Sequence, residues 1–245
     1  MSRTVLRVAG PDREKFLQGL VTNDVAKLRD GLVYAALLTP QGKYLADFFL
    51  VPEESAILID VDSELAAPLL QRLSMYKLRS DVQIEETDLA VSRGLGEIPE
   101  NGFSDPRSAE LGWRRYTNTA SDQEKIDWDE IRVEHLIPET NRELFPNDSY
   151  ILEMGFERLN GVDFKKGCYV GQEVTARMKH KTELKKGLAK VSVSGNASEG
   201  DEITSGSKPV GRLLTTANET ALAYVRFDRA TGEMAAGAAS VELLA

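Results

Sequence analysis

The order of strand-like and helix-like segments in the first 90 residues most strongly limits the fold. Residues 33–38 and 44–51 alternate as strands do, and Thr39-Pro40-Gln41-Gly42-Lys43 between them has the composition of a hairpin turn. The other elements expected in this part are strands at 4–8, 56–61 and 82–84 and amphipathic helices at 12–20 and 63–78. Strands joined by hairpins, without a repeated strand–helix unit, predict an α+β fold. No glycine-rich phosphate loop follows a strand, which argues against a Rossmann domain.

The composition of the chain changes past Lys186. Residues 94–110 are rich in Gly, Pro, Ser and charge and predict a surface connection, and helices are expected near 128–136 and 149–160. Short strands then alternate with Gly, Ser and Asn turns, at 188–193, 210–214, 221–225 and 241–244. This pattern is typical of a small antiparallel β-barrel. We therefore predict a mixed α/β domain over residues 1–183 and a C-terminal β-barrel over residues 184–245.

Charge and residue counts exclude several classes of protein. The formal charge is -9 over 245 residues, which argues against general binding to nucleic acid or anionic membranes. No apolar run approaches the roughly 20 residues that cross a bilayer. The N-terminus reads as a first strand and not as a targeting segment. One cysteine excludes an internal disulfide, and with only two histidines no metal site is expected. The expectation is a soluble cytoplasmic protein with no nucleic-acid or membrane partner.

The run Lys166-Gly167-Cys168-Tyr169-Val170-Gly171-Gln172-Glu173 holds the only cysteine. Its glycines free the backbone for tight turns, and a neighbouring lysine favours the thiolate form of a cysteine. A helix beginning near Gln172 would place Cys168 close to a helix N-terminus, which stabilises an anion. A lone cysteine is more commonly a small buried hydrophobe. The neighbours favour a reactive thiol here.

Three further features each leave an alternative open. Glu173 and Arg177 share a helical face, as a functional pair or as an ordinary surface ion pair. Between residues 165 and 190, eight basic residues against two glutamates indicate an anionic ligand or partner, or a solvated connector. These basic residues are Lys165, Lys166, Arg177, Lys179, Lys181, Lys185, Lys186 and Lys190. Asp47, in a strand of apolar neighbours, either accepts from a buried N–H donor or faces water.

The octapeptide 166–173, with Arg177 after it, resembles the signature of the YgfZ-type folate-binding proteins, relatives of a mitochondrial iron–sulfur maturation factor. Residues 16–25, Pro40-Gln41-Gly42-Lys43 with Asp47, and residues 211–223 resemble other parts of that family. The resemblance implies a folate-binding domain like that of the glycine-cleavage T-protein, followed by a β-barrel. It also implies a tetrahydrofolate-dependent accessory role in assembling or repairing iron–sulfur clusters, including those of radical-SAM and tRNA-modifying enzymes. Iron–sulfur client or carrier proteins would be its partners, and Cys168 its catalytic residue.

The wider superfamily includes the aminomethyltransferase of glycine cleavage. Resemblance to that enzyme places Asp47 at its catalytic aspartate, Glu134 at the carboxylate that binds the pterin, and Arg158 near a folate-contacting arginine. The signature adds further candidates for cofactor binding around the cysteine, namely Lys166, Tyr169, Gln172, Glu173 and Arg177. This chain is shorter than T-proteins and has a cysteine signature that they lack. We therefore expect a maturation factor and not a turnover enzyme, with aminomethyl transfer and a purely docking module as alternatives.

Overall fold

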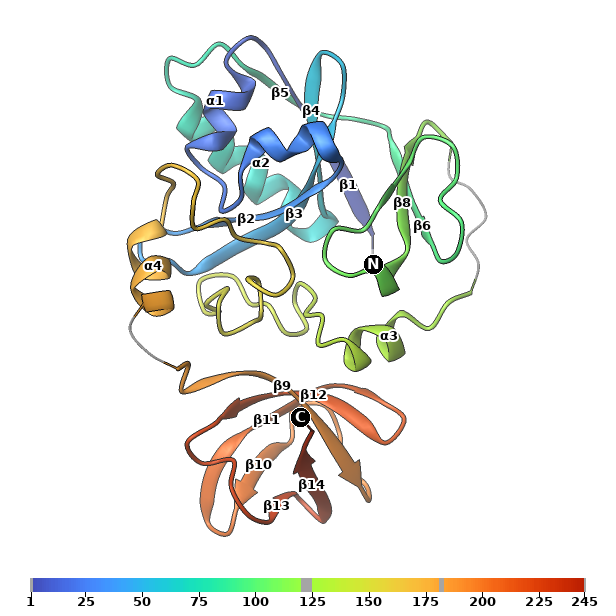
Figure 1. The fold of residues 1–245 in the computed structure, drawn as a ribbon, viewed down its shortest axis with the longest axis vertical. Coiled ribbons are helices and arrows are strands. Elements are labelled where there is room, and N and C mark those ends of the chain that lie inside the picture. The colour runs from blue at the N-terminus through green and yellow to red at the C-terminus, as the bar shows by residue number, and fades with distance from the viewer. Residues whose placement is uncertain (1, 120–124, 181–182, 245) are drawn as a thin grey trace. The chain divides into compact units, whose positions relative to one another are not determined.

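The chain divides into two compact units, each built from two stretches of sequence (Figure 1). The computed structural model describes residues 2–119, 125–180 and 183–244. The first unit comprises Met1–Ile126 and Phe156–Val174, and the second comprises Asp127–Gly155 and Thr175–Ala245. The second unit therefore contains residues 127–155 in addition to the segment predicted as a barrel domain. The domain boundary at residues 183/184 stays a prediction.

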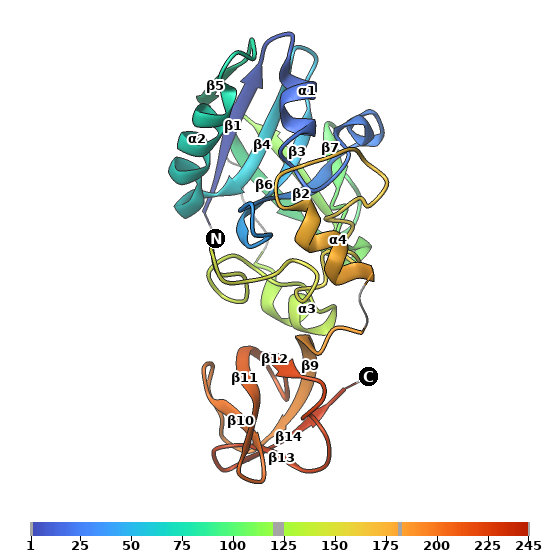
Figure 2. The ribbon, with the colours of Figure 1, turned by 90° about the vertical axis from the view of Figure 1, so that its left-hand side faces the viewer.

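A five-stranded antiparallel sheet with the order β2-β3-β4-β1-β5 forms the centre of the first unit. Its strands are β1 (Arg3–Ala9), β2 (Val33–Leu38), β3 (Tyr44–Pro52), β4 (Ala56–Asp62) and β5 (Gln83–Glu86). Helix α2 (Ser63–Lys77) begins where the Asp62 side chain accepts from the backbone N–H of Glu64. It packs along β1, β4 and β5 (Figure 2). Its leucines Leu65, Leu69 and Leu73 are buried. The strands and α2 confirm the sequence prediction for this part.

Helix α1 and the 3-10 helix η1 cover the connection between β1 and β2. Their bounds are Arg13–Gln18 and Val25–Asp30. The short helix expected at residues 12–20 is confirmed in shorter form. Phe16 and Leu17 of α1 are buried.

A second, three-stranded sheet with the order β6-β8-β7 completes the first unit. Its elements are β6 (Ala90–Gly94), β7 (Gly102–Ser104), the 3-10 helix η2 (Ala109–Leu111) and β8 (Trp113–Thr117). The prediction of a plain surface connection over residues 94–110 was wrong where β7 and η2 form. Gly94 and Gly112 allow close backbone approach at this point, because a Cβ on Gly112 would collide with the Gly94 carbonyl.

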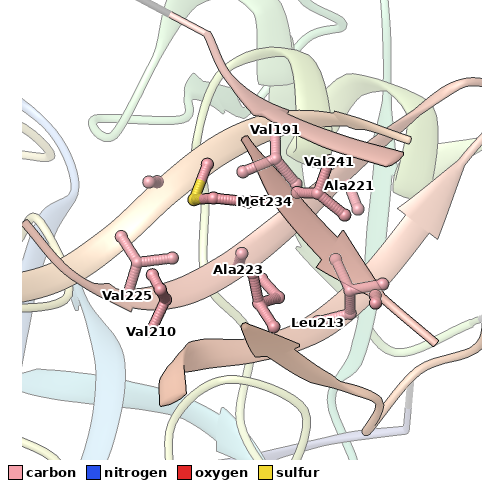
Figure 3. Close-up of a cluster of buried hydrophobic side chains, with 11 residues drawn as sticks. Val191, Val210, Leu213, Ala221, Ala223, Val225, Met234 and Val241 are labelled. Atoms are coloured by element: carbon pink, nitrogen blue, oxygen red, sulfur yellow. The ribbon is translucent and has the colours of Figure 1, made fainter. Parts of the chain in front are cut away.

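The second unit contains a closed antiparallel barrel with the strand order β10-β11-β12-β9-β14-β13. Its strands are β9 (Lys186–Ser194), β10 (Glu202–Ser205), β11 (Lys208–Ala217), β12 (Thr220–Arg226), β13 (Met234–Ala236) and β14 (Ala239–Leu243). Alternate residues of these strands point inward and form an apolar core that includes Val191, Leu213 and Val225 (Figure 3). Four strands were predicted. The short β10 and β13 were not.

Helix α3 (Trp128–Glu134) also belongs to the second unit. It begins after Asp127, whose carboxylate accepts from the backbone N–H groups of Asp129 and Glu130. The helix expected at 149–160 was wrong, because residues 151–160 form successive turns. Gly155 (φ 78°) and Asn160 (φ 55°) have left-handed backbones that a right-handed helix cannot include.

The chain passes from the first unit to the second within α4 (Gln172–His180). This helix confirms the prediction of a helix from Gln172 onward. Among the described residues, no helix combines the length and the apolar character that crossing a membrane requires.

Candidate functional site

Lys166 anchors the octapeptide at its N-terminal end. Its side chain is only 7% exposed, and its ammonium donates to the backbone carbonyls of Gln18 (2.8 Å) and Val21. The same ammonium lies 5.1 Å from the ring centroid of Tyr169. Burial lowers the pKa of Lys166 to about 8. The lysine predicted as a cofactor contact is thus a buried structural contact between the octapeptide and residues 18–21.

The segment before Lys166 is bonded to the connection between α1 and β2. The backbone N–H of Asp163 donates to the Thr22 carbonyl (3.0 Å), and the Thr22 hydroxyl donates to the Gly161 carbonyl (2.7 Å). The ammonium of Lys27 pairs with the Asp163 carboxylate at 2.7 Å. Residues 16–25 and the octapeptide, which the sequence resemblance picked out separately, therefore form one substructure.

Two glycines bring the C-terminal end of the octapeptide against the β2–β3 hairpin. Gly171 has φ +84°, and a Cβ there would lie 2.6 Å from the Thr39 carbonyl oxygen. Gly42 of the hairpin has φ +75°, and a Cβ there would lie 2.8 Å from the Cβ of Val174. Both positions require glycine, for backbone conformation and for space.

Cys168 is exposed between these two anchors. Its two neighbours in the sequence differ in solvent exposure: Gly167 is exposed and Tyr169 is buried. The alternative of a buried packing cysteine is therefore wrong. The thiol lies four residues before α4 begins, on a loop that Lys166 and Gly171 fix at both ends.

Asp47 is buried in β3 at 5% exposure. Its carboxylate accepts hydrogen bonds from the hydroxyls of Tyr34 (2.9 Å) and Tyr44 (2.6 Å). The alternative of a solvent-facing aspartate is wrong, and the donors are phenols where N–H groups were expected. Burial, and then the Asp47 charge, raise the pKa of Tyr34 well above its ordinary value, so its hydroxyl stays a donor.

The remaining predicted residues are distributed over both units. Arg158, Gln172 and Glu173 belong to the first unit, and Glu134 and Arg177 to the second. Arg158, Glu173 and Arg177 are exposed and Gln172 is half-buried. Lys181 of the basic segment lies outside the described residues.

Glu134 is the last residue of α3 and accepts a hydrogen bond from Lys190 of β9. Their Oε1 and Nζ atoms are 2.8 Å apart, and the bond and charge of Lys190 lower the pKa of the Glu134 carboxyl. The pair lies entirely within the second unit.

A buried network of charges, which sequence reasoning missed, holds the two sheets of the first unit together. Asp60 of β4 accepts from Arg3 (2.6 Å) and from Arg114 of β8 (3.0 Å). Asp105 pairs with Arg107 (2.8 Å) and with the same Arg114 (3.0 Å). The one local signal was the Asp105-x-Arg107 spacing, since Asp105 and Arg114 are nine residues apart and the two pairs of Asp60 span 57 and 54 residues.

Comparison with known proteins places this geometry in a family. Residues 185–245 match the model of the CAF17 C-terminal beta-barrel domain. The iron-sulfur cluster assembly factor IBA57, mitochondrial, of Homo sapiens is 32% identical over 258 residues, covering 89% of this chain and 70% of that protein. The chain belongs to the IBA57 family of iron–sulfur cluster assembly factors.

Other relatives extend this result. The IBA57 homologs of Neurospora crassa and Mycosarcoma maydis are 31% and 32% identical, over 76% and 78% of this chain. The matches span only 51% and 55% of those fungal proteins, about half their length. The resemblance to the YgfZ-type family is thus borne out at the level of its mitochondrial iron–sulfur relatives.

A crystal structure of the glycine cleavage system aminomethyltransferase T from Bartonella henselae has the same fold. The TM-score is 0.80 over 99% of this chain and 83% of that one, at 13% sequence identity. Such a likeness shows the fold alone. It confirms the predicted T-protein-like α+β architecture with a C-terminal barrel.

The comparisons contradict one expectation. A cytoplasmic location was predicted, but the IBA57 relatives of Neurospora crassa, Mycosarcoma maydis, Homo sapiens and Mus musculus are named as mitochondrial proteins. The prediction depended on the absence of a recognisable targeting segment, which is negative evidence, and it was wrong.

Proposed function

We propose that this protein binds tetrahydrofolate and assists the assembly or repair of iron–sulfur clusters in client enzymes, including radical-SAM and tRNA-modifying enzymes. The observation that carries the proposal is the exposed thiol of Cys168 on a loop anchored at Lys166 and Gly171. An exposed thiol held in place suits contact with a second protein. Membership of the IBA57 family supports the same reading.

The chemistry assigned to Cys168 is ligand exchange, with the cluster as cargo. A deprotonated thiol is both the nucleophilic and the metal-binding form of cysteine. A cubane cluster takes about four thiolates, and this chain has one cysteine. The other ligands therefore come from iron–sulfur client or carrier proteins or from a small thiol. Cys168 gives up its proton and its thiolate replaces one thiolate ligand of the cluster, which leaves as the protonated thiol, so no redox step is needed.

Glu134 fits the role of a pterin acceptor. One oxygen accepts from Lys190, and an ionised carboxylate keeps acceptor capacity beyond one such partner. The paired N–H donors of a pterin match that capacity. Arg177 is exposed and belongs to the same unit as Glu134, and its guanidinium is suited to the anionic glutamyl tail.

Asp47 fits a direct role on folate poorly. Both of its carboxylate oxygens accept from tyrosine hydroxyls in a buried site. A catalytic aspartate of an aminomethyltransferase must reach the folate amine. The arrangement at Asp47 therefore supports the accessory role over one-carbon transfer.

Two substitutions separate the thiol from the folate site. Cys168→Ala should remove support of an iron–sulfur enzyme in a reconstitution assay while calorimetric binding of tetrahydrofolate is kept. Glu134→Ala should weaken tetrahydrofolate binding about tenfold, or about 1.4 kcal/mol. Ser207→Ala, an exposed change in the barrel, is the control. Full support of the iron–sulfur enzyme by Cys168→Ala would refute the role of the thiol.

A further inference from the structure

An open hollow of about 740 Å³ lies in the first unit, and none of the residues proposed above for folate or clusters lines it. It is formed by α1, by the C-terminal end of α2 and by the residues that follow α2. Apolar side chains of Phe16, Leu20 and Tyr76 line it. Its volume falls within the range of sites that bind ligands or side chains.

Three cations also line this hollow, namely Lys15, Lys77 and Arg79. Within the part of the chain that the structure describes, none of the three has an ion-pair partner. The one acidic lining residue, Asp12, accepts from the backbone N–H of Asp81 at 2.8 Å. A local excess of positive charge on a chain of net charge -9 indicates a site for an anionic group.

A large apolar side chain stands at the edge of the hollow. Leu78 is 88% exposed, and its backbone has φ 43°, a conformation that leucine rarely adopts. Met75, one helical turn before it, is 71% exposed. Strained backbone that presents an apolar side chain to solvent is a feature of binding sites more than of packing.

We propose that this hollow binds an acidic segment of a partner protein that carries at least one large apolar side chain. The carboxylates pair with Lys15, Lys77 and Arg79, and the apolar side chain packs on Leu78 and Tyr76. The inference rests on the proposed function only in that an assembly factor must dock other proteins. A free anion would leave the exposed Leu78 side chain uncovered, so the combined chemistry favours a peptide.

The test uses the full chain, and the peptide ligands are selected from a random library. A random-peptide phage library is selected on the wild-type protein, and enriched peptides are synthesised and titrated by fluorescence anisotropy at low and high salt. The selected peptides should be acidic with an apolar residue. Their affinity should fall about tenfold for K15E/R79E and for Leu78→Ser, and fall with salt.

Matched variants separate this site from general charge and from the thiol. K208E/R212E makes the same change in charge at exposed barrel residues, and it should bind the peptides as the wild type does. Cys168→Ala should also bind the peptides normally. The peptide test is therefore independent of whether Cys168 acts on clusters. Circular dichroism confirms that each variant is folded.

Several outcomes would overturn the proposal. If no peptide is enriched, or if the enriched peptides lack acidic residues, the proposal of an acidic partner segment is refuted. If K15E/R79E binds the peptides as tightly as the wild type does, the peptide site lies elsewhere on the protein. Flotation with phosphatidylglycerol vesicles that K15E/R79E abolishes would instead assign the hollow to a membrane surface, and competition by inorganic phosphate alone would assign it to a small anion.

Discussion

Lys166 carries its charge in a nearly closed environment, so its protonation is linked to the stability of the fold. Because burial lowers its pKa to about 8, the folded state releases this proton at lower pH than the unfolded state does. The unfolded state then binds more protons between about pH 8 and pH 10.4, and the free energy of unfolding rises with pH across that window.

Lys166→Met should remove this rise in stability. It should also lower the free energy of unfolding near pH 7 by about 1–3 kcal/mol, because two buried carbonyls lose their donor. Urea unfolding at about pH 7 and pH 9.5 measures both effects. Lys165→Met changes the exposed neighbour and should do neither. A pH dependence retained in Lys166→Met would refute the assignment.

Asp105 gives a pH dependence of the same sign, in an acidic window. Burial alone would raise its pKa, but the charges of Arg107 and Arg114 lower it to about 2. Its contribution to stability is therefore complete above about pH 4 and is lost as the pH falls toward 2.

The acid limb of the stability curve should show this loss. About 2 kcal/mol should disappear between pH 5 and pH 2.5, and Asp105→Asn should flatten that part of the curve by a similar amount. Asp228→Asn, which changes an exposed partner of Arg226, is the control. An unchanged acid limb in Asp105→Asn would show that other carboxylates carry the effect.

At the scale of elements, the sequence predicted those parts whose pattern is local. Strands β2 and β3 and the hairpin turn between them are readable because alternation and turn residues lie within a few positions. Helix α4 was readable for the same reason. The strands β6 to β8 were missed, because Gly94, Gly102 and Gly112 give them the composition of a loop.

The candidate site likewise has one part that the local sequence predicts and another part that depends on long-range contacts. The octapeptide identified Cys168, but its exposure depends on anchors about 145 residues earlier in the chain, at Gln18 and Val21. Long-range contacts of that kind leave no periodic pattern. The buried network around Asp60 was missed for the same reason, since Arg114 lies 54 residues away.

Gly171 tests the docking of the octapeptide on the β2–β3 hairpin. Gly171→Ala adds a Cβ that would lie 2.6 Å from the Thr39 carbonyl at φ +84°. We expect a loss of about 2–4 kcal/mol, and faster labelling of Cys168 by a thiol reagent, because the loop must move.

Gly96→Ala is the matched control for that change. Gly96 lies in the same unit at φ +77°, with nothing within 4 Å of an added Cβ. It therefore reports the cost of the backbone conformation alone, about 1 kcal/mol. Equal losses for the two variants would mean that the close approach to the hairpin contributes nothing.

At the scale of the whole molecule, the change in composition past Lys186 predicted the barrel. No sequence feature predicted that residues 127–155 belong to the same unit. Residues 127–155 join it through Arg132 of α3, which is 2% exposed. Its guanidinium binds the Glu143 carboxylate at 3.0 Å and the Thr215 hydroxyl of β11 at 3.2 Å. Nothing in the local pattern around Arg132 distinguishes it from a surface arginine of an amphipathic helix.

Arg132→Met should therefore destabilise the second unit more than the first. Removing Arg132 leaves the buried Glu143 carboxylate without its cationic partner, at a cost of about 3–5 kcal/mol. The two tryptophans report the units separately, because Trp113 belongs to the first and Trp128 to the second. Urea unfolding in Trp113→Phe and Trp128→Phe backgrounds should show the larger shift in the Trp128 signal.

A double substitution and a surface control make the Arg132 prediction decisive. Arg132→Met with Glu143→Leu removes both charges and should recover part of the loss, because no buried charge is then left without a partner. Arg226→Ala breaks an exposed pair with Asp228 and should cost at most about 1 kcal/mol. If Arg132→Met costs no more than Arg226→Ala, then Arg132 does not hold residues 127–155 to the barrel, and other contacts of α3 with β11 and β12 must do so.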